Sequence, residues 1–227
     1  MKVLIICGGA GSRWNNYKDT EKHLVKVKDE VLLERTIRQL REHNVTDISI
    51  IKEKGCNSYD YLDVPTLDIV RRNDLHGDID KLLSSKKYWS GDDRTVLLLG
   101  DVYFSDDAIK SIVTCNDRDW FQFGRLNPSK ITGKKWNENF AFSFFPEHIT
   151  QIYEAGVKSF ELLNKKLIRR NTMAQFYRVM CGKDGKSADY RGQPQENLGN
   201  FIVIDDITDD FDYPKDYEKM IQVLNNG

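Results

Sequence analysis

The chain has 227 residues, of which 40% are hydrophobic and 30% charged, and its formal net charge is −1. This length and apolar content suffice for one sizeable α/β domain, whereas the near-neutral charge offers no positive field to a nucleic acid. The apolar runs are too short to span a bilayer, residues 1–7 lack signal-peptide features, and the four cysteines match neither a zinc site nor a redox pair. These properties predict a cytoplasmic protein that binds neither nucleic acid nor membrane.

The first predicted element is a strand over residues 2–7, because this apolar, β-branched run suits burial on both faces. A glycine-rich turn follows, in which the backbone N–H groups can approach a bulky anion closely. Arg13 and Lys22 add positive charge just beyond it. The stretch therefore predicts a polyphosphate site, with Arg13 and Lys22 as its cations. Its backbone candidates are Cys7, Gly8, Gly9, Ala10, Gly11 and Ser12.

Two common phosphate-binding motifs do not fit this stretch. A P-loop requires Gly-Lys-Ser/Thr after its second glycine, which is missing here. A dinucleotide-binding fingerprint requires a third glycine where Trp14 stands, and a helix that starts at once, whereas residues 15–19 are typical of a loop. A glycine turn with no ligand remains the alternative.

Alternating elements continue through the first half of the chain. Helices are expected at 32–44, 79–89 and 106–113, and strands at 47–51 and 95–99, with a short edge strand within 63–70. The run 95–99 ends in Gly100 and Asp101, so we expect a central parallel strand with a carboxylate at its carboxyl end, where ligands of open α/β sheets bind. Beside a polyphosphate, that carboxylate requires a bridging cation, and Mg²⁺ prefers oxygen ligands. The alternative is that Asp101 caps the following helix.

The second half of the chain is expected to complete the sheet. Strands are predicted at 120–124, 139–145 and 200–205, and helices at 146–166 and 173–180. Pro214 is expected in the first turn of a final helix. The loop 125–136 is polar and cationic, and no repeat or low-complexity linker divides the chain.

Three segments together resemble the nucleotidyltransferase family of sugar-phosphate and alcohol-phosphate pyrophosphorylases. Residues 8–13 are similar to G-G-x-G-[ST]-R, residues 21–27 to the segment with P-K-x-L, and residues 32–37 to the helix that begins P-L-L. Glu21 and Val31 stand where this family often has proline. The resemblance implies a single-domain three-layer αβα sandwich with a mixed, mostly parallel sheet, like the nucleotide-diphospho-sugar transferases. The single domain would span residues 1–227, with a nucleotide-binding half at about 1–115 and an acceptor-binding half at about 116–227.

The resemblance also implies roles for residues along the chain. Gly100 and Asp101 match the L-x-G-D motif, in which Gly100 would contact the nucleotide. Residues 210–217 resemble D-I-D-T-P-E-D-Y, which makes Asp212 a second Mg²⁺ ligand with Asp210 or Asp205 as a possible helper. Base recognition would involve Arg72 and Gly77, although Asp78 replaces the usual hydroxyl residue. The cations that would grip the acceptor are Arg125, Lys130, Lys134 and Lys135. The alternatives are a helix entry at Gly77, a solvated basic loop, and an acidic, capped helix after Asp212.

The expected function is Mg²⁺-dependent transfer of a nucleotidyl group from an NTP, with CTP or UTP favoured, to a phosphorylated small molecule, with release of pyrophosphate. The protein would act as a monomer or homodimer. One alternative is a nucleotide-sugar glycosyltransferase, but those enzymes usually carry Asp-x-Asp where Asp101-Val102-Tyr103 has one carboxylate. The other is a catalytically silent nucleotide-binding subunit.

Overall fold

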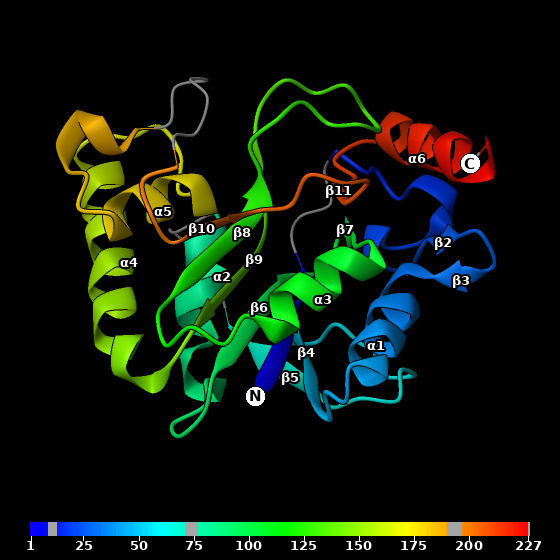
Figure 1. Cartoon of the computed structure of the whole chain (residues 1–227), viewed down its shortest axis with the longest axis horizontal. Coiled ribbons are helices and arrows are strands. Elements are labelled where there is room, and N and C mark those ends of the chain that lie inside the picture. Colours follow the sequence, from blue (N-terminus) through cyan, green and yellow to red (C-terminus); the bar gives the residue numbers. More distant parts are fainter. Residues whose placement is uncertain (9–12, 71–76, 190–196, 227) are drawn as a thin grey trace.

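A twisted sheet runs through the centre of the computed structural model, which describes residues 1–8, 13–70, 77–189 and 197–226 (Figure 1). In these ranges the sheet has seven strands in the order β10-β8-β9-β6-β1-β4-β5. The strands are β1 (Lys2–Ile6), β4 (Asp47–Glu53), β5 (Thr66–Ile69), β6 (Thr95–Leu99), β8 (Phe121–Arg125), β9 (Glu138–Phe144) and β10 (Phe201–Val203). Only β9 runs antiparallel to its neighbours β6 and β8, so this part of the chain confirms the mixed, mostly parallel sheet.

Helices cover both faces of the sheet (Figure 1). The helices α1 (Leu32–Glu42) and α3 (Asp106–Thr114) lie on one face, and α2 (Asp78–Ser84), α4 (Ile149–Asn164) and α5 (Met173–Met180) lie on the other. Side chains of β1 alternate between the two layers, with Val3 and Ile5 packed toward α1 and Leu4 and Ile6 toward α2. The predicted three-layer αβα sandwich is therefore confirmed.

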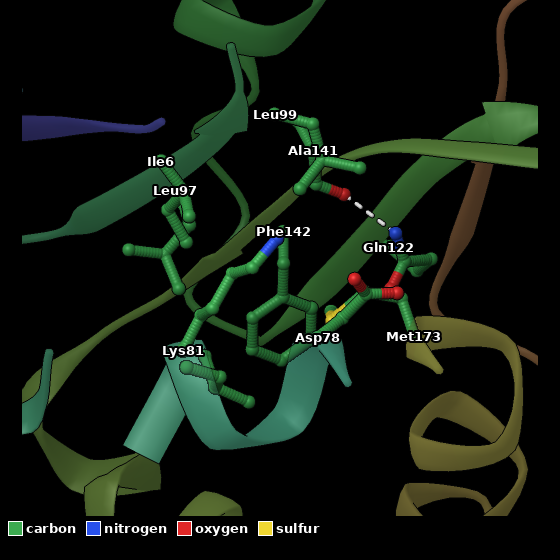
Figure 2. A pocket seen from close by; sticks show the side chains of 10 residues that line it. Ile6, Asp78, Lys81, Leu97, Leu99, Gln122, Ala141, Phe142 and Met173 are labelled. Carbon is green, nitrogen blue, oxygen red and sulfur yellow. Dashed lines mark hydrogen bonds between the residues drawn. The ribbon is translucent and has the colours of Figure 1, made fainter. Parts of the chain in front are cut away.

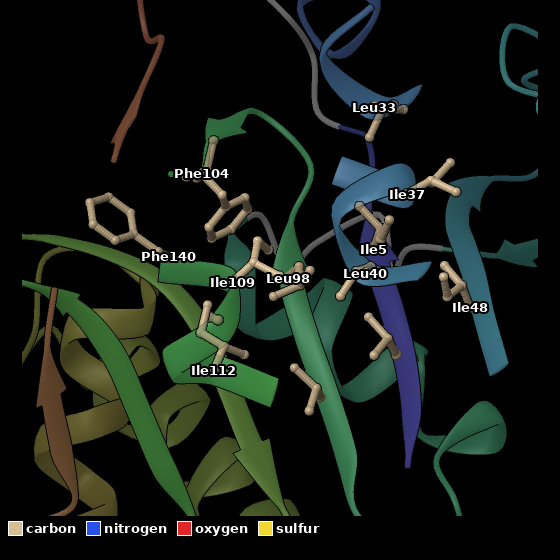
Figure 3. Close-up of a cluster of buried hydrophobic side chains, with 14 of the residues drawn as sticks. Ile5, Leu33, Ile37, Leu40, Ile48, Leu98, Phe104, Ile109, Ile112 and Phe140 are labelled. Atoms are coloured by element: carbon tan, nitrogen blue, oxygen red, sulfur yellow. The ribbon is translucent and has the colours of Figure 1, made fainter. Parts of the chain in front are cut away.

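The layer under α1 and α3 explains why the central strands read as unbroken apolar runs. Figure 3 shows Ile5 and Leu98, on neighbouring strands, in one apolar cluster with side chains of α1 such as Ile37 and with the apolar face of α3. Ile5 and Leu98 are fully buried, and their strand neighbours are buried on the opposite face. A strand that is buried on both faces needs apolar residues at every position.

Most predicted elements form within a few residues of their expected bounds. The expected helix at 79–89 is shorter, because α2 ends at Ser84 and a 3₁₀ turn, Lys86–Tyr88, follows it. The expected helix at 146–166 likewise begins with the 3₁₀ turn Pro146–His148 before α4. Helix α6 (Pro214–Asn226) begins at the predicted proline.

Two short ladders in the described residues were not predicted, because two-residue strands have no periodicity to detect. The first pairs β2 (Lys26–Val27) with β3 (Glu30–Val31), and the second pairs β7 (Val102–Tyr103) with β11 (Asp209–Asp210), both antiparallel. The second ladder holds the segment that precedes α6 next to the residues that follow β6. Helix α6 then packs over the N-terminal segment through a separate apolar cluster that contains Trp14, Val25 and Met220.

No helix in the described ranges combines the length and the apolar character needed to cross a bilayer.

Candidate active site

The candidate site lies where β1 and β6 end side by side. Gly100, directly after β6, donates its N–H to the carbonyl of Ile6 at 3.0 Å. A Cβ on Gly100 would lie 2.5 Å from Sγ of Cys7, so no larger residue fits there without a shift. Cys7 is buried, and burial raises the pKa of its thiol well above the usual value. Cys7 and Gly100 therefore bring the two strand ends into close contact, which places Gly8 and Asp101 at one edge of the sheet.

Lys22 and Asp101 form an ion pair at this edge. Lys22 begins a 3₁₀ turn, Lys22–Leu24, and its Nζ contacts Oδ2 of Asp101. The side chains keep 17% and 22% of their surface exposed, so a ligand can reach the pair. Burial opposes both charges, but their mutual attraction outweighs it, so the pKa of Lys22 is raised and that of Asp101 lies well below its usual range. Both groups are therefore charged at neutral pH.

His23, directly after Lys22, packs beneath the turn on the buried side of this ion pair. Its ring is 3% exposed and lies against Gly100, since a Cβ added there would be 3.2 Å from Cδ2 of His23. Nδ1 of His23 shares a hydrogen bond of 3.0 Å with the hydroxyl of Tyr59, which is also buried. Burial lowers the pKa of His23 to about 3, so the ring is neutral at physiological pH. His23 thus connects the turn that carries Lys22 with the residue that precedes Asp101.

The C-terminal segment brings Asp212 to the same edge. The β7–β11 ladder continues in a hydrogen bond of 3.3 Å from the N–H of Phe211 to the carbonyl of Asp101. Oδ2 of Asp212 lies 2.7 Å from Nη1 of Arg13, whose guanidinium also faces the ring of Tyr213 at 5.7 Å. Burial lowers the pKa of Arg13, but Asp212 and Tyr213 more than offset it and the net pKa is raised. The structure therefore brings together the four charged residues Arg13, Lys22, Asp101 and Asp212.

Lys134 lies among carboxylates. Its Nζ is 3.0 Å from Asp216, 3.6 Å from Asp210 and 3.8 Å from Asp212, and the side chain is 7% exposed. Burial lowers the pKa of Lys134, but the carboxylates outweigh it and raise the pKa to about 12. Burial and the neighbouring Asp212 raise the pKa of Asp210 to about 7. Lys134 therefore neutralises the carboxylates around Asp212, an arrangement that no local sequence pattern indicated.

Glu138, the first residue of β9, belongs to the same acidic group. Burial, followed by the negative charges of Asp210 and Asp212, raises its pKa well above the usual value. Two buried carboxyl groups with raised pKa values therefore lie next to Asp212, which Lys134 also contacts. An additional cation would favour the charged forms of both groups.

The donor set fits Mg²⁺. Asp101 and Asp212 offer carboxylate oxygens, which are the ligands this ion prefers, and Mg²⁺ commonly takes its remaining ligands from phosphates and water. The described residues contain no group of three or more His, Cys, Asp or Glu side chains placed to hold a metal by themselves. Oδ1 of Asp210, close by, is buried and receives no hydrogen bond from any described residue. The residues thus suit an ion that a bound polyphosphate helps to hold.

The cations predicted to bind the acceptor differ in how the structure places them. Arg125 is 1% exposed, and its two terminal nitrogens bind Asp209 at 3.1 Å and the carbonyls of Asn127 and Trp136. Since these partners occupy the guanidinium, we leave Arg125 out of the proposed acceptor site; Lys134 likewise has internal partners. Lys130 is half exposed and pairs with Asp205 at 3.4 Å. Lys135 is exposed.

Other predicted residues have simple structural explanations or cannot be placed. Gly77 has φ +133°, and a Cβ there would lie 2.3 Å from the carbonyl oxygen of Asn171, so close packing requires glycine whether or not a base binds. The cap of α3 is Ser105, which accepts a hydrogen bond from the N–H of Ala108, so Asp101 does not cap that helix. Gly9, Ala10, Gly11, Ser12 and Arg72 lie outside the described residues.

Comparisons with known proteins agree with this geometry. The family model of the MobA-like NTP transferase domain matches residues 3–123, which is more than half of the chain. No curated protein matches the sequence.

Three similar solved structures are named for nucleotidyl transfer, and their sequence identities to this chain are low. A Bacillus anthracis protein named as a glucose-1-phosphate thymidylyltransferase has a TM-score of 0.61 at 18% identity, over 100% of this chain and 96% of that one. The CTP:phosphocholine cytidylyltransferase of Streptococcus pneumoniae has a TM-score of 0.60 at 16% identity, over 98% of each chain. The inositol-1-phosphate CTP transferase of T. maritima has a TM-score of 0.59 at 15% identity, over 98% of this chain and 95% of that one. These likenesses show a shared fold, and with the family match they establish that the chain belongs to the MobA-like NTP transferase domain family and is a nucleotidyltransferase.

Proposed function

We propose that this nucleotidyltransferase moves an NMP group from an NTP, CTP or UTP by preference, to a phosphorylated small molecule, with Mg²⁺ and with release of pyrophosphate. One observation carries the proposal: two cation–carboxylate pairs, Lys22–Asp101 and Arg13–Asp212, lie at the ends of β1 and β6 and are joined by the β7–β11 ladder. Opposite charges at one sheet edge suit a ligand that carries both phosphate groups and a bound metal ion.

The reaction requires little proton transfer from the protein. An anionic oxygen of the acceptor's phosphate forms a bond to the α-phosphorus, and the bond from that phosphorus to the bridging oxygen of the β-phosphate breaks. The electron pair leaves with pyrophosphate. Because the nucleophile is already anionic, catalysis depends on positioning and on compensation of charge.

The side chains divide these tasks. Lys22 gives a compact positive charge to the α-phosphate and the acceptor's phosphate, and Arg13 stabilises the departing pyrophosphate. Asp101 and Asp212 would hold Mg²⁺, which supplies Lewis-acid neutralisation of the developing charge. In the structure the same carboxylates bind Lys22, Arg13 and Lys134, and these pairs hold the side chains at the site.

Two observations support a phosphorylated acceptor: the substrates for which the structural neighbours are named, and the exposed lysines of the β8–β9 loop. The structural neighbours are named for glucose 1-phosphate, phosphocholine and inositol 1-phosphate, which share a phosphate monoester. We assign the nucleotide to about residues 1–115 and the acceptor to about 116–227. In the second half Lys130 and Lys135 are the exposed cations of the β8–β9 loop that can meet an acceptor. The family assignment also supports nucleotidyl transfer over glycosyl transfer.

The test is a pyrophosphate-release screen of CTP, UTP, GTP and ATP against a panel of sugar phosphates and alcohol phosphates, with Mg²⁺. The proposal expects stoichiometric pyrophosphate and a nucleoside diphosphate-linked product with at least one pair. Release of a nucleoside diphosphate from a nucleotide sugar, without pyrophosphate formation from any pair, would contradict it.

A further inference from the structure

Lys134 is a buried cation beside the candidate active site. It lies in the loop between β8 and β9, which extends from the sheet to α6 (Figure 1). Its side chain is 7% exposed, whereas that of Arg13 is 54% exposed and that of Lys22 is 17% exposed. Arg13 and Lys22 are therefore accessible to a bound polyphosphate, but Lys134 is enclosed by protein. Direct binding of substrate phosphates does not explain a cation in this position.

Hydrogen bonds within the loop hold the backbone of Lys134. Its carbonyl accepts from Nη1 of Arg125 at 3.4 Å, and its N–H donates to the hydroxyl of Thr132 at 3.4 Å. Arg125 and Thr132 both bind Asp209, which belongs to β11. These contacts place the Lys134 side chain beside the segment that follows β11.

The Lys134 ammonium is shared by three carboxylates. Its Nζ lies 3.0 Å from Asp216, 3.6 Å from Asp210 and 3.8 Å from Asp212. The carboxylate of Asp216 is 3% exposed and accepts a hydrogen bond from the N–H of Tyr213 just before α6, so it has a structural role. Asp210 is 7% exposed, and no described residue donates a hydrogen bond to its Oδ1. Lys134 thus connects a structural carboxylate and a buried carboxyl group with the candidate metal ligand Asp212.

Two cations approach the same oxygen of Asp212. Nη1 of Arg13 lies 2.7 Å from its Oδ2, and Nζ of Lys134 lies 3.8 Å from that atom. In the described part of the chain no acceptor is aligned with Nζ for a hydrogen bond, so Lys134 acts on Asp212 through charge. A divalent ion that approaches Asp212 is therefore repelled by both cations. A polyphosphate can draw the exposed Arg13 away, whereas the enclosed Lys134 stays in place.

The other candidate ligand, Asp101, is balanced by cations that are partly exposed. Lys22 forms an ion pair with it, and Lys81 of α2 adds a second positive charge nearby. Figure 2 shows the ammonium of Lys81 reaching from α2 toward Leu99, the last residue of β6, through a narrow and largely apolar pocket. Both lysines keep part of their surface exposed. The enclosed Lys134 therefore differs from the cations around Asp101.

We propose that Lys134 is a fixed counter-cation that prevents the carboxylates of the site from holding a divalent ion by themselves, so that Mg²⁺ binds tightly only together with the NTP. The inference rests on the proposed function and specifies how its metal and nucleotide depend on each other. Phosphate oxygens of the NTP add the negative charge and the ligands that outweigh the fixed ammonium. Lys134 thus acts on the metal through Asp212, without contact to the substrate.

The experiment measures binding of Mn²⁺, a paramagnetic substitute for Mg²⁺, to the full chain without nucleotide, by water-proton relaxation enhancement. Lys134→Met removes the charge at similar volume. This variant should bind Mn²⁺ at least about tenfold more tightly than the wild type, because the positive charge 3.8 Å from Asp212 is gone. Combination with Asp212→Asn should abolish the gain. Equal affinity in Lys134→Met and the wild type would overturn the proposal.

Lys52→Met is the matched control. The Lys52 side chain is also 7% exposed, and its Nζ lies 3.2 Å from Asp68 and 3.4 Å from Asp60. These two carboxylates are about half exposed, and neither belongs to the candidate site. Lys52→Met should therefore leave the affinity for Mn²⁺ unchanged. A gain as large as that of Lys134→Met would contradict a special role of Lys134.

A second measurement covers the loss of stability that accompanies removal of a buried cation. Thermal unfolding is followed by circular dichroism with and without Mn²⁺. An ion that compensates the carboxylates in place of the ammonium should raise the unfolding midpoint of Lys134→Met more than that of the wild type. A variant that stays unfolded in Mn²⁺, or that gains no more than the wild type, would contradict the proposal.

A third arm separates this inference from the proposed function. CTP, UTP, GTP and ATP are added in turn to the wild type, and relaxation enhancement distinguishes the protein-bound ion from the ion on free nucleotide. At least one NTP should strengthen Mn²⁺ binding by about tenfold or more. If none does, the proposed function loses its metal-bound nucleotide, and this inference falls with it. If one does, but Lys134→Met gains no affinity without nucleotide, only the role of Lys134 is wrong.

Discussion

Arg125–Asp209 and Lys22–Asp101 are two ion pairs at the same edge of one sheet, since β8 and β6 both end there. In the first pair both side chains are 1% exposed. Asp209 also accepts hydrogen bonds from the hydroxyls of Ser129 and Thr132. In the second pair the exposed fractions are 17% and 22%.

The difference lies in how completely each pair is enclosed by other partners. Arg125 uses its guanidinium on Asp209 and on backbone carbonyls of the β8–β9 loop, so it holds that loop to the segment before α6. Lys22 has one close carboxylate, and its charge remains accessible at the ends of β1 and β6. An enclosed pair stabilises the fold, whereas an accessible pair can exchange its partner for a ligand. We therefore expect opposite consequences when each pair is broken.

The largest effect is expected for Arg125→Ala. Removal of the guanidinium leaves Asp209 buried and uncompensated, which should lower the free energy of unfolding by about 3–5 kcal/mol. Urea denaturation measures this change. Arg118→Ala is the control, because the Arg118–Glu147 pair is exposed and should cost less than about 1 kcal/mol. Equal losses in the two variants would show that burial does not distinguish the pairs.

Lys22→Ala should give the opposite result. The variant should lose about 10²–10³ in kcat, or roughly 3–4 kcal/mol of transition-state stabilisation, because one electrostatic donor to the reacting phosphate is gone. Its free energy of unfolding should fall by less than that of Arg125→Ala, because Asp101 keeps part of its surface in contact with solvent. Steady-state pyrophosphate release and urea denaturation measure the two quantities. Lys2→Ala, which breaks an exposed pair at the opposite end of β1, should retain wild-type turnover; wild-type turnover in Lys22→Ala would refute the role of this lysine.

Burial of neutral His23 next to the Lys22–Asp101 pair should make the stability of the protein sensitive to acid. His23 has a folded-state pKa of about 3, below its usual value of 6.5. Below pH 6.5 the unfolded chain therefore binds a proton at His23 that the folded chain does not bind. The contribution of neutral His23 to the free energy of unfolding is complete above pH 6.5 and is lost as the pH falls toward 3. Between pH 7 and pH 5 this costs about 2 kcal/mol. Denaturation of wild type and His23→Asn at both pH values isolates the contribution. The wild type should lose about that much more than the variant, and parallel losses would contradict a neutral, buried His23.

The smallest effect is expected for Tyr59→Phe. Loss of the hydroxyl leaves Nδ1 of His23 unpaired and loosens the turn that carries Lys22, so kcat should fall by about tenfold, equivalent to roughly 1.4 kcal/mol, while KM for the NTP stays the same. Tyr177→Phe removes a buried hydroxyl with backbone partners on the far side of the sheet. It should lose similar stability without a loss of kcat. Equal turnover in the two variants would mean that Tyr59 does not position Lys22.

The sequence predicted the layered fold well because most of its elements carry strong periodic signals. Residues 95–99 are apolar at almost every position, as a strand buried on both faces requires, and α1 and α5 have clear apolar faces. The β7–β11 ladder left no such signal. Its two-residue strands form because Asp209 is held by Arg125 and because α6 packs against Trp14 and Val25, which are contacts between distant segments.

The candidate site was predictable in part for the same reason. Gly8, Lys22 and Asp101 lie within local patterns, so their convergence at one edge followed from the order of parallel strands. The cations of residues 125–136 look alike in the sequence, yet Arg125 and Lys134 are buried among carboxylates while Lys130 and Lys135 are not. Burial there depends on Asp209 and Asp216, more than 80 residues away. Local pattern carries no information on such a pairing.

The central claim is that Asp101 and Asp212 act on one Mg²⁺-bound triphosphate. The most direct measurement is a double-mutant cycle with Asp101→Asn, Asp212→Asn and the combined variant, in which pyrophosphate release is titrated with Mg²⁺. If both carboxylates hold one ion, each single variant should need at least about tenfold more Mg²⁺ for half-maximal rate, and the combined variant should be no worse than the poorer single. Additive losses, or an unchanged requirement for Mg²⁺ in either single variant, would contradict the account.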